Sequence, residues 1–306
     1  MVDVVVRTKN RTAFLARALD DVLAQTFTDW HLTVVNDGGD PGPVAGLVAE
    51  RPRLKGRTTV LDLPESVGHP AAANKGFWAG SAEFVALHDD DDTWHSEFLA
   101  RTVAHLRRTA DTAVAVRTEI VWERQVGSQI VETGREVFHP LMQEPTYFDL
   151  IRFNHIVPIS MLVRRSVLES IGGFDESIEM VEDWVFNLEI ALHGGFGFIA
   201  GEPLAFWHQR PESQGDSGNS VISGHDGHVR SDRRVRDRLV REYVKQHGAG
   251  GLLYLAKYID ERNTEVLRHL DRIEARQDQI VAMLHARTVR GVAGRVRRRV
   301  RALRRR

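Results

Sequence analysis

The sequence predicts an α/β fold with a mixed, mostly parallel sheet flanked by helices, and three observations support this fold class. Short apolar, β-branched segments alternate with segments whose apolar residues recur at helical spacing. Such alternation is typical of parallel strands joined by right-handed helical crossovers. The segments that follow the predicted strands are rich in Asn, Asp and Gly. Open α/β sheets bind their ligands at these carboxyl ends of the strands.

The first part of the chain contains four predicted strands, at residues 2–6, 30–35, 59–63 and 84–88. Each is a run of mainly apolar residues, as in strands covered on both faces. A helix is expected after Thr12, which can cap it, and a short one after Pro43. The third helix opens at residues 68–70, where a proline suits the first turn, and the fourth follows a cap at Ser96.

The middle of the chain is less regular. Strands are predicted at residues 113–122, 129–133 and 159–163, and helices at 147–153, from Ser166 and from Glu182. A polar, glycine-rich stretch from Gly218 to Gly224 marks a domain boundary. We therefore expect one domain over residues 1–225, with halves 1–110 and 111–225, and a helical extension over residues 226–306.

Composition gives further limits. The 306 residues are 42% hydrophobic and 27% charged, which is ordinary for a globular protein. Cysteine is absent, which excludes disulfides and thiolate metal sites and fits a reducing compartment. We expect neither a signal peptide nor a membrane span, because no apolar stretch approaches the necessary length of about 18 residues. The net charge of -1 conceals a contrast, since residues 287–306 carry ten Arg and no acid while the remainder has a net charge of -11.

Four consecutive carboxylates, Asp89-Asp90-Asp91-Asp92, follow the predicted strand 84–88 directly. Neighbouring like charges repel by about 1 kcal/mol even in water, and a divalent cation removes that cost. Mg²⁺ and Mn²⁺ prefer oxygen ligands from one or two carboxylates together with substrate phosphates. In an extended chain Asp89 and Asp91 would point to one side and Asp90 and Asp92 to the other. The alternative interpretation is a solvated acidic turn.

Several segments together resemble the inverting family 2 glycosyltransferases, which have the GT-A fold and a DXD element. The resemblance covers about residues 1–222, and five matching segments in the right order make it specific. They are RTKNR at 7–11, NDGGD at 36–40, the glycine-to-asparagine helix at 68–76, the aspartates at 89–92, and GGFDE at 172–176 followed by EDW at 182–184. The resemblance implies a nucleotide-sugar half at 1–110 and an acceptor half at 111–225.

The resemblance also implies a donor site. Asp91 would bind Mn²⁺ or Mg²⁺ on the diphosphate, with Asp89 orienting the metal or the ribose. Asp37 would accept a hydrogen bond from the base, which suits uracil, although a turn residue is the alternative interpretation. The remaining residues expected to bind the donor are Thr8, Asn10, Arg11, Asn74, Lys75, Asp90 and Arg210. One departure is Ala73, where the family often has Arg; Lys75 or His69 could substitute.

The acceptor half supplies the expected base. Asp183 would deprotonate the acceptor hydroxyl, with Glu182 in support, and its place at a helix N-terminus predicts an ionised carboxylate. The alternative is that both acids only complement the helix dipole. His208 is a candidate third metal ligand, although a lone His is more often structural, and Arg210 is a candidate phosphate clamp. Residues 214–220 are expected to form a flexible lid.

The extension contains two patterns. Ile259, Val266, Ile273 and Ile280 recur every seven residues within a predicted helix 252–286, which indicates a coiled coil and a homo-oligomer, or a helix lying on its own domain. Residues 287–306 place valines on one face among arginines, as in helices that bind anionic membranes. A nucleic-acid-binding arm and a disordered tail are the alternatives. We expect a cytoplasmic protein, peripheral on the inner face of the cell membrane.

The complete prediction is a metal-dependent, inverting hexosyltransferase that uses a nucleotide-sugar donor, with a UDP-sugar favoured, and a glycan or lipid-linked acceptor. Two alternatives remain at this point. A nucleotidyltransferase also uses carboxylate-bound metal, but the usual basic, glycine-rich loop after the first strand is absent from the sequence. The other alternative is a non-catalytic sugar-binding or scaffolding protein, against which the presence of Asp89, Asp91 and Asp183 argues.

Overall fold

The computed structural model describes residues 1–126, 129–178, 180–213 and 225–303. The chain forms two compact units, Met1–Val235 and Arg236–Arg306. The predicted lid at 214–220 and the predicted boundary segment at 218–224 lie outside the described residues.

Two sheets organise the described part of the first unit. The larger has seven strands in the order β10-β6-β9-β4-β1-β2-β3, and the smaller has the order β5-β11-β7-β8. In the larger sheet only β9 pairs antiparallel with its neighbours, so the sheet is mixed and mostly parallel as predicted. The strands are β1 Val2–Thr8, β2 Trp30–Asp37, β3 Thr58–Leu63, β4 Phe84–Asp89, β5 Thr93–Trp94, β6 Ala113–Val116, β7 Thr118–Val126, β8 Gln129–Val137, β9 Met161–Arg164, β10 Phe196–Ile199 and β11 Ala205–Gln209.

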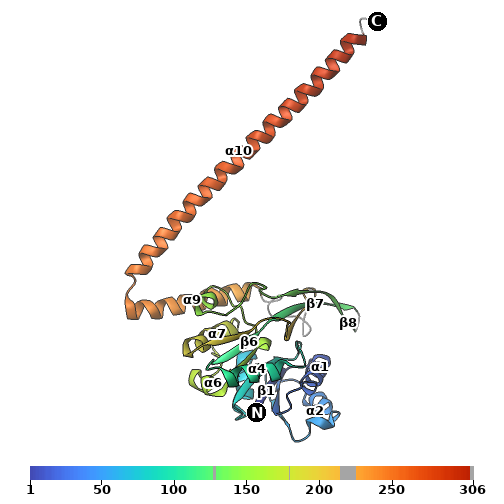
Figure 1. Ribbon diagram of the computed structural model, residues 1–306, viewed down its shortest axis with the longest axis vertical. Coiled ribbons are helices and arrows are strands. Elements are labelled where there is room, and N and C mark those ends of the chain that lie inside the picture. Colours follow the sequence, from blue (N-terminus) through green and yellow to red (C-terminus); the bar gives the residue numbers. More distant parts are fainter. Residues whose placement is uncertain (127–128, 179, 214–224, 304–306) are drawn as a thin grey trace. The chain divides into compact units, whose positions relative to one another are not determined.

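Helices cover both faces of the larger sheet (Figure 1). Alternate residues of β1 separate the two cores, since Val4 packs with α1, α2 and α4, whereas Val5 packs with α3, α6 and α7. The helices of this unit are α1 Thr12–Leu23, α2 Pro41–Ala49, α3 His69–Trp78, α4 Phe98–Arg108, α5 Tyr147–Arg152, α6 Arg165–Ile171 and α7 Glu182–His193, with short 3₁₀ turns at Pro52–Leu54 and Pro158–Ser160.

The parallel register brings the carboxyl ends of three strands together. β1 lies between β2 and β4, with Thr8 opposite Asn36 on one side and Arg7 opposite Asp89 on the other. The polar segments at these strand ends therefore meet at one edge of the sheet, although residues in contact there are up to 82 positions apart in sequence. This edge is the place where the sequence predicts the ligand site.

The structure corrects several predicted elements. The single strand predicted at 113–122 is two strands, β6 and β7, which belong to different sheets and separate at Arg117. Thr12 and Ser96 are not N-caps, because Arg11 precedes α1 and Glu97 precedes α4 at the cap position, neither with a side-chain capping bond. The sequence did not predict strand β10. This strand is only four residues long and begins directly after the two glycines that follow α7.

The second unit is helical where it is described. Helix α9 (His225–His247) begins in the first unit and continues into the second, and α10 (Gly250–Leu303) follows after a short break. The predicted helix 252–286 and the backbone of the predicted tail up to Leu303 are thus one helix. None of the helices in the described residues has the length and apolar character needed to span a membrane.

Candidate active site

The aspartate run turns immediately after β4. Asp89 is the last residue of the strand, Asp90 and Asp91 form a turn, and the chain resumes as β5 at Thr93. The alternation expected for an extended run is therefore wrong, because Asp90 and Asp91 contact the same arginine. Arg11 lies 3.0 Å from Asp90 Oδ1 and 2.6 Å from Asp91 Oδ2. The turn concentrates the carboxylates instead of distributing them over two faces.

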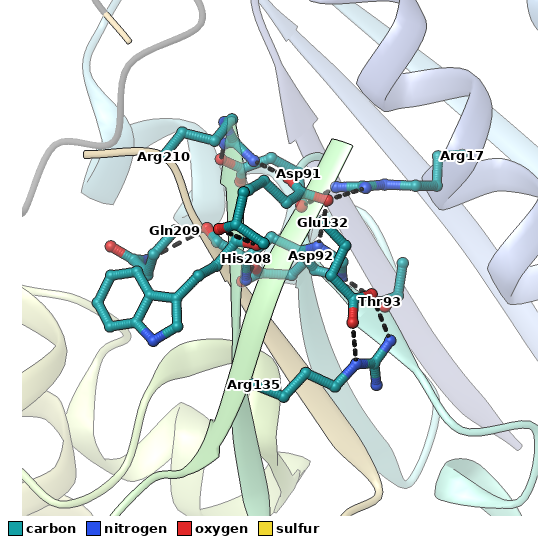
Figure 2. A network of polar contacts seen from close by, with 12 residues as sticks. Arg17, Asp91, Asp92, Thr93, Glu132, Arg135, His208, Gln209 and Arg210 are labelled. Carbon is teal, nitrogen blue, oxygen red and sulfur yellow. Dashed lines mark hydrogen bonds and ion pairs between the residues drawn. The ribbon is translucent and has the colours of Figure 1, made fainter. Parts of the chain in front are cut away.

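Arginine side chains balance the negative charge of the carboxylates, and one threonine hydroxyl donates a hydrogen bond to them. Arg7 Nε donates to Asp89 Oδ1 at 2.8 Å, and Thr8 Oγ1 donates to Asp90 Oδ2 at 2.7 Å. Arg210 and Arg11 both pair with Asp91 Oδ2, and Figure 2 shows Arg210 and Arg17 directed toward Asp91. Buried carboxylates persist as anions only when they are paired in this way.

The pKa values of the aspartates differ because burial and neighbouring charges act on each of them to a different extent. Burial raises the pKa of Asp91, but the charges of Arg11 and Arg210 outweigh it and hold the pKa below its usual range. Burial raises the pKa of Asp90 to about 7 against the opposing charge of Arg11. Burial, together with the charge of Asp91, raises the pKa of Asp92 well above its usual range. Asp91 is therefore ionised at neutral pH, whereas the environment of Asp92 favours its uncharged form.

A second ion-pair network joins this turn to the smaller sheet. Glu123 on β7 accepts from Arg17 at 3.0 Å, from His208 Nδ1 at 2.7 Å and from Arg210 at 2.8 Å. Burial raises the pKa of Glu123, but His208, Arg17 and Arg210 together lower it to about 2. The guanidinium groups of Arg17 and Arg210 also lie 5.6 and 4.5 Å from the Phe14 ring centroid. Glu123 thus fixes the arginines that compensate Asp91.

His208 has hydrogen bonds at both ring nitrogens. Nδ1 must donate to ionised Glu123, and burial lowers the pKa of the imidazole, so that Nε2 is an acceptor for the Thr93 hydroxyl at 2.9 Å. The backbone N–H of His208 donates to Asp92 at 2.8 Å. The metal-ligand role of His208 stays a prediction, and in this structure the ring joins β11 to β5 and β7. Arg210, predicted as a phosphate clamp, is 1% exposed and lies inside the same network.

The residues expected around the nucleoside lie at the same sheet edge. Asp37 accepts from Ser66 Oγ at 2.7 Å and from the Val67 backbone at 2.7 Å, so its carboxylate orders the loop before α3. Asn10 has a positive φ of 55° and accepts from the Asp40 backbone at 3.1 Å. Both positions adjoin Thr8, and their contacts to a base stay predictions.

Asn74 has a different environment from the one expected of a donor ligand. Its amide donates to Phe174 O and to Glu176 at 2.9 Å each, and its oxygen accepts from the Phe174 backbone at 2.8 Å. It is 4% exposed and ties α3 to the 172–176 turn that precedes α7. Gly173 is required at the contact, because a Cβ there would lie 2.4 Å from Asn74 Oδ1 and its φ is 80°. Lys75, by contrast, is exposed.

Asp183, the predicted general base, and Glu182, its predicted support, lie in the first turn of α7. Asp183 Oδ2 accepts from Asn154 at 2.7 Å and Oδ1 accepts from its neighbour's backbone, Trp184 N, at 2.8 Å. Burial raises the pKa of Asp183 to about 6, and burial with the charge of Asp183 raises the pKa of Glu182 to about 7. Burial outweighs the hydrogen bonds from Trp184 and Asn154, which lower the pKa of Asp183, but with a pKa of about 6 the carboxyl is still mostly ionised at neutral pH.

Asn154 is held in one orientation by Asn187, one helical turn after Asp183. Asn187 Nδ2 donates to Asn154 Oδ1 and to Ile156 O, both at 2.9 Å. Because Asn154 Oδ1 is thereby an acceptor, its amide nitrogen must face Asp183. Asn187 is completely buried. The two asparagines therefore position the Asp183 carboxylate.

Arg7 connects the two halves of the site electrostatically. Burial lowers its pKa, but Asp89, Glu182 and Asp183 together raise it above its usual range. Its guanidinium also donates to His69 O at 2.9 Å. The aspartate run and the candidate base therefore share one counter-ion.

Sequence reasoning missed Arg7, Arg17, Glu123, Asn154 and Asn187 as site residues. Arg7 lies inside the 7–11 segment, so its position directly after the predicted strand 2–6 was the available signal. Arg17 lies on the predicted first helix, where a charged residue normally indicates a solvated face, and Glu123 directly follows the predicted strand 113–122. The segment around Asn154 matches no motif, and only the fold brings it to Asp183.

The carboxylates at this edge suit a hard divalent ion. Asp89 is the member of the run nearest to solvent, with 21% of its side chain exposed, and 12% of the Asp91 side chain is exposed. Within the described residues, no three His, Asp or Glu side chains are grouped to hold a metal by themselves. The residues thus fit an ion that takes its remaining ligands from substrate phosphates and not from an all-protein site.

Comparisons with known proteins agree with this geometry. Residues 3–172 match the model of "Glycosyl transferase family 2". The glycosyltransferase YwdF of Bacillus subtilis, itself uncharacterised, is 29% identical over 194 residues, which are 62% of this chain and 68% of YwdF. A putative colanic acid biosynthesis glycosyl transferase of Escherichia coli, WcaA, is 21% identical over 79% of this chain and 85% of WcaA.

Two solved structures show the fold. Residues 1–349 of TarS from S. aureus, in complex with UDP, align with a TM-score of 0.56 at 18% identity, over 69% of this chain and 61% of that one. The mannosyltransferase PcManGT of Pyrobaculum calidifontis, in complex with GDP-Man and Mn²⁺, aligns with a TM-score of 0.51 at 20% identity, over 67% and 56% of the two chains. The chain thus spans about three fifths of the length of these structures.

The mixed, mostly parallel sheet, the carboxylate run at the end of β4 and a family match across more than half of the chain lead to one conclusion. The protein is an enzyme with the GT-A fold and belongs to glycosyl transferase family 2.

Proposed function

We propose that the protein transfers a sugar from a nucleotide-sugar donor to a hydroxyl of a glycan or lipid-linked acceptor, with inversion at the anomeric carbon. The observation that carries the proposal is the position of Arg7. It pairs with Asp89 at the donor edge, and its charge acts on Glu182 and Asp183 of the acceptor half. A candidate base and the predicted diphosphate site are therefore within electrostatic range of each other. Family membership makes a nucleotidyltransferase or a non-catalytic scaffold the weaker interpretation.

The proposed donor is a sugar nucleotide, with a UDP-sugar favoured. Support comes from the fold relatives, whose structures contain UDP and GDP-Man, and from Asp37, a hydrogen-bond acceptor beside Thr8 and Asn10 at the sheet edge. Arg11 is one-fifth exposed and pairs with both Asp90 and Asp91, so its guanidinium can also meet a diphosphate at this edge. Guanidinium groups recognise phosphate oxygens by charge-assisted, bidentate hydrogen bonds.

We propose that Asp89 and Asp91 hold Mn²⁺ or Mg²⁺. When bound, such an ion neutralises the charge that develops on the departing diphosphate. The protein's own contribution is the pairing of Asp91 with Arg11 and Arg210, which keeps this carboxylate ionised despite its burial.

Asp183 is the proposed general base. Its carboxylate accepts the proton of the acceptor hydroxyl while that oxygen forms a bond to the anomeric carbon and the bond from this carbon to the diphosphate breaks. Attack from the face opposite the leaving group inverts the configuration. With a pKa of about 6, Asp183 is mostly ionised at neutral pH, whereas Glu182, with a pKa of about 7, holds a proton about half of the time. At neutral pH Asp183 is therefore deprotonated more often than Glu182 and is more often available to accept a proton.

Membrane binding by residues 287–306 is proposed from the sequence. The helix α10 continues through this segment to Leu303, and the side chains there lie outside the described part of the structure. Ten arginines without a single acid provide attraction of about 1 kcal/mol each to an anionic leaflet, and a row of valines provides an apolar face. Such binding would hold the enzyme on the inner face of the cell membrane, beside a lipid-linked acceptor.

The first test identifies the donor and the metal requirement. A thermal-shift screen of UDP-, GDP-, dTDP- and CMP-sugars, with and without Mn²⁺, finds the ligand that stabilises the protein by mass action. The sugar nucleotide found is then used in transfer and hydrolysis assays. Absence of both binding and hydrolysis across the panel would rule out the proposed function.

The Asp91→Asn variant should lose transfer by at least about 100-fold, because the charge of the metal-binding carboxylate is removed without a change in shape. Initial rates at saturating donor, with and without chelator, measure this. The matched control is Asp92→Asn, which should keep near-normal activity because Asp92 is not a proposed metal ligand and an amide oxygen can still accept from the His208 backbone. Wild-type activity that persists unchanged in excess chelator would disprove the metal requirement.

The Asp183→Asn variant should lower kcat by about 100-fold to 10,000-fold, since it cannot accept the acceptor proton, while donor binding stays unchanged. Steady-state kinetics and calorimetric titration with the donor measure the two effects. Glu182→Gln is the control, with a smaller loss expected. If Asp183→Asn weakens the donor complex but keeps turnover, the residue belongs to the donor site.

The pH dependence of kcat should reflect the Asp183 carboxyl. Because the base acts only when deprotonated, kcat should rise with pH through about 6 and be level above pH 7. Asn154→Leu removes a hydrogen bond that favours the charged form, so the pKa rises and the acid limb moves to higher pH. Rates from pH 5 to 8 for both proteins provide the measurement, and coincident profiles would show that Asn154 does not act on the base.

The full chain should float with anionic liposomes but not with neutral ones, because the attraction of the tail is electrostatic. A chain ending at Ala286 should remain at the bottom of the gradient with both. Flotation at low and physiological salt, together with a competition by duplex DNA, measures the preference. Equal behaviour of the two chains, or a preference for DNA at physiological salt, would exclude membrane anchoring by the tail.

A further inference from the structure

Helix α10 carries an exposed apolar stripe. Ile259, Val266, Ile273 and Ile280 are spaced by seven residues and have exposed fractions of 51–56%. Leu270 lies four residues after Val266 and is 50% exposed. Seven-residue spacing with steps of three and four is the pattern of a coiled-coil seam, in which each residue inserts between residues of a facing helix.

The heptad positions follow from this spacing. We place Ile259, Val266, Ile273 and Ile280 at position d of the heptad. Position a of the next heptad is then the residue four positions after each of them. The a column contains Asn263, Leu270, Gln277 and Leu284, so that polar and apolar layers alternate along the seam. Asn263 and Gln277 are exposed in the single chain. A seam with polar layers at fixed places restricts how a partner helix can align with it.

We propose that residues 259–284 form a parallel, in-register coiled coil with the same segment of further copies of this chain. The partner is another copy because the polar layers of the seam complement themselves when two identical helices align in parallel and in register. This proposal is independent of the transferase chemistry.

The polar layers favour the parallel arrangement. In a parallel, in-register pair, Asn263 faces Asn263 and Gln277 faces Gln277 of the other copy. Each carboxamide is both donor and acceptor and can therefore bond to its counterpart. In an antiparallel pair these residues would meet the apolar d residues of the partner. A buried carboxamide without a hydrogen-bond partner is costly, so that alignment is disfavoured.

The flanking positions are compatible with the same arrangement. Position g carries Arg262, His269, Arg276 and Met283, and position e carries Asp260, Leu267, Glu274 and Val281. In a parallel coil each g residue lies against the e residue five positions further along in the partner, which places His269 beside Glu274 and the stems of Arg262 and Arg276 along Leu267 and Val281. In an antiparallel coil, g residues lie against g residues, so that cations would face cations. The described ion pairs of the single helix, such as Arg262 with Glu265, are exposed and do not occupy the seam.

Assembly would also strengthen membrane binding. A parallel coil places the segments after residue 286 of all copies at the same end. Several basic tails then act together, and binding of the first raises the effective concentration of the others at the surface. This arrangement connects the two patterns of the second unit.

The assembly is tested with the full chain by size-exclusion chromatography with light scattering at micromolar concentration. The wild type should have at least twice the monomer mass. Val266→Asp combined with Ile273→Asp should give a monomer whose catalytic unit stays folded by circular dichroism. The matched control, Ala275→Asp with Ala282→Asp, places the same charges on the outer face and should keep the wild-type mass. A monomeric wild type, or equal masses for the two double variants, would overturn the proposal.

The orientation is tested by single cysteines, for which the absence of native cysteine is an advantage. In a parallel coil, Ile280→Cys lies opposite itself and should form an interchain disulfide under mild oxidation, seen as a doubled band on a non-reducing gel. Ala282→Cys, on the outer face, should not. In an antiparallel coil residue 280 would lie near residue 263 of the partner. Failure of Ile280→Cys to cross-link in a protein that is oligomeric by light scattering would refute the parallel arrangement.

Discussion

The pairing of Asp91 with Arg11 and Arg210 is the interaction on which the rest of the site depends. Four carboxylates in succession at the end of a buried strand cannot be packed unless positive charge lies against them. The positive charge comes from the start of α1 and from the end of β11, at opposite ends of the first unit's sequence. Glu123 in turn holds Arg210, Arg17 and His208. One buried network therefore joins the two sheets and places the carboxylates at the sheet edge.

The donor and acceptor halves are connected by two further contacts of different kinds. Asn74 binds the 172–176 turn through both ends of its carboxamide, which is a purely structural tie. Arg7 connects the halves through charge, since Asp89 on one side and Glu182 and Asp183 on the other share it as a counter-ion. Binding of an anion at the donor edge would alter the charge that Arg7 experiences. In this structure Arg7 lowers the pKa of Asp183 and Asp89 raises it, so that the charges at the end of β4 act on the candidate base.

Burial decides the chemistry of the candidate base. The first turn of a helix favours a carboxylate by no more than about 1 kcal/mol in ordinary surface geometry. Desolvation of Asp183 is stronger than this and moves its pKa toward neutrality, which is where a general base is most effective. The hydrogen bonds from Asn154 and from the Trp184 backbone limit the rise. Asp183 is consequently basic enough to accept a proton and still ionised at neutral pH.

The sequence by itself determined the order of strands and helices in the donor half, the position of the carboxylate run and the start of α7. These features depend on local patterns, namely apolar runs and turn residues, which act over a few residues. Only the tertiary structure decided which cations meet which aspartates, that residues 113–126 divide between two sheets, that Asn74 holds a turn, and that Asn154 orients Asp183. Each of these contacts joins residues 29 to 119 positions apart, or depends on which sheet edge is open to a strand. Local propensity contains no information on such pairs, because burial and charge compensation arise only when the whole chain has folded.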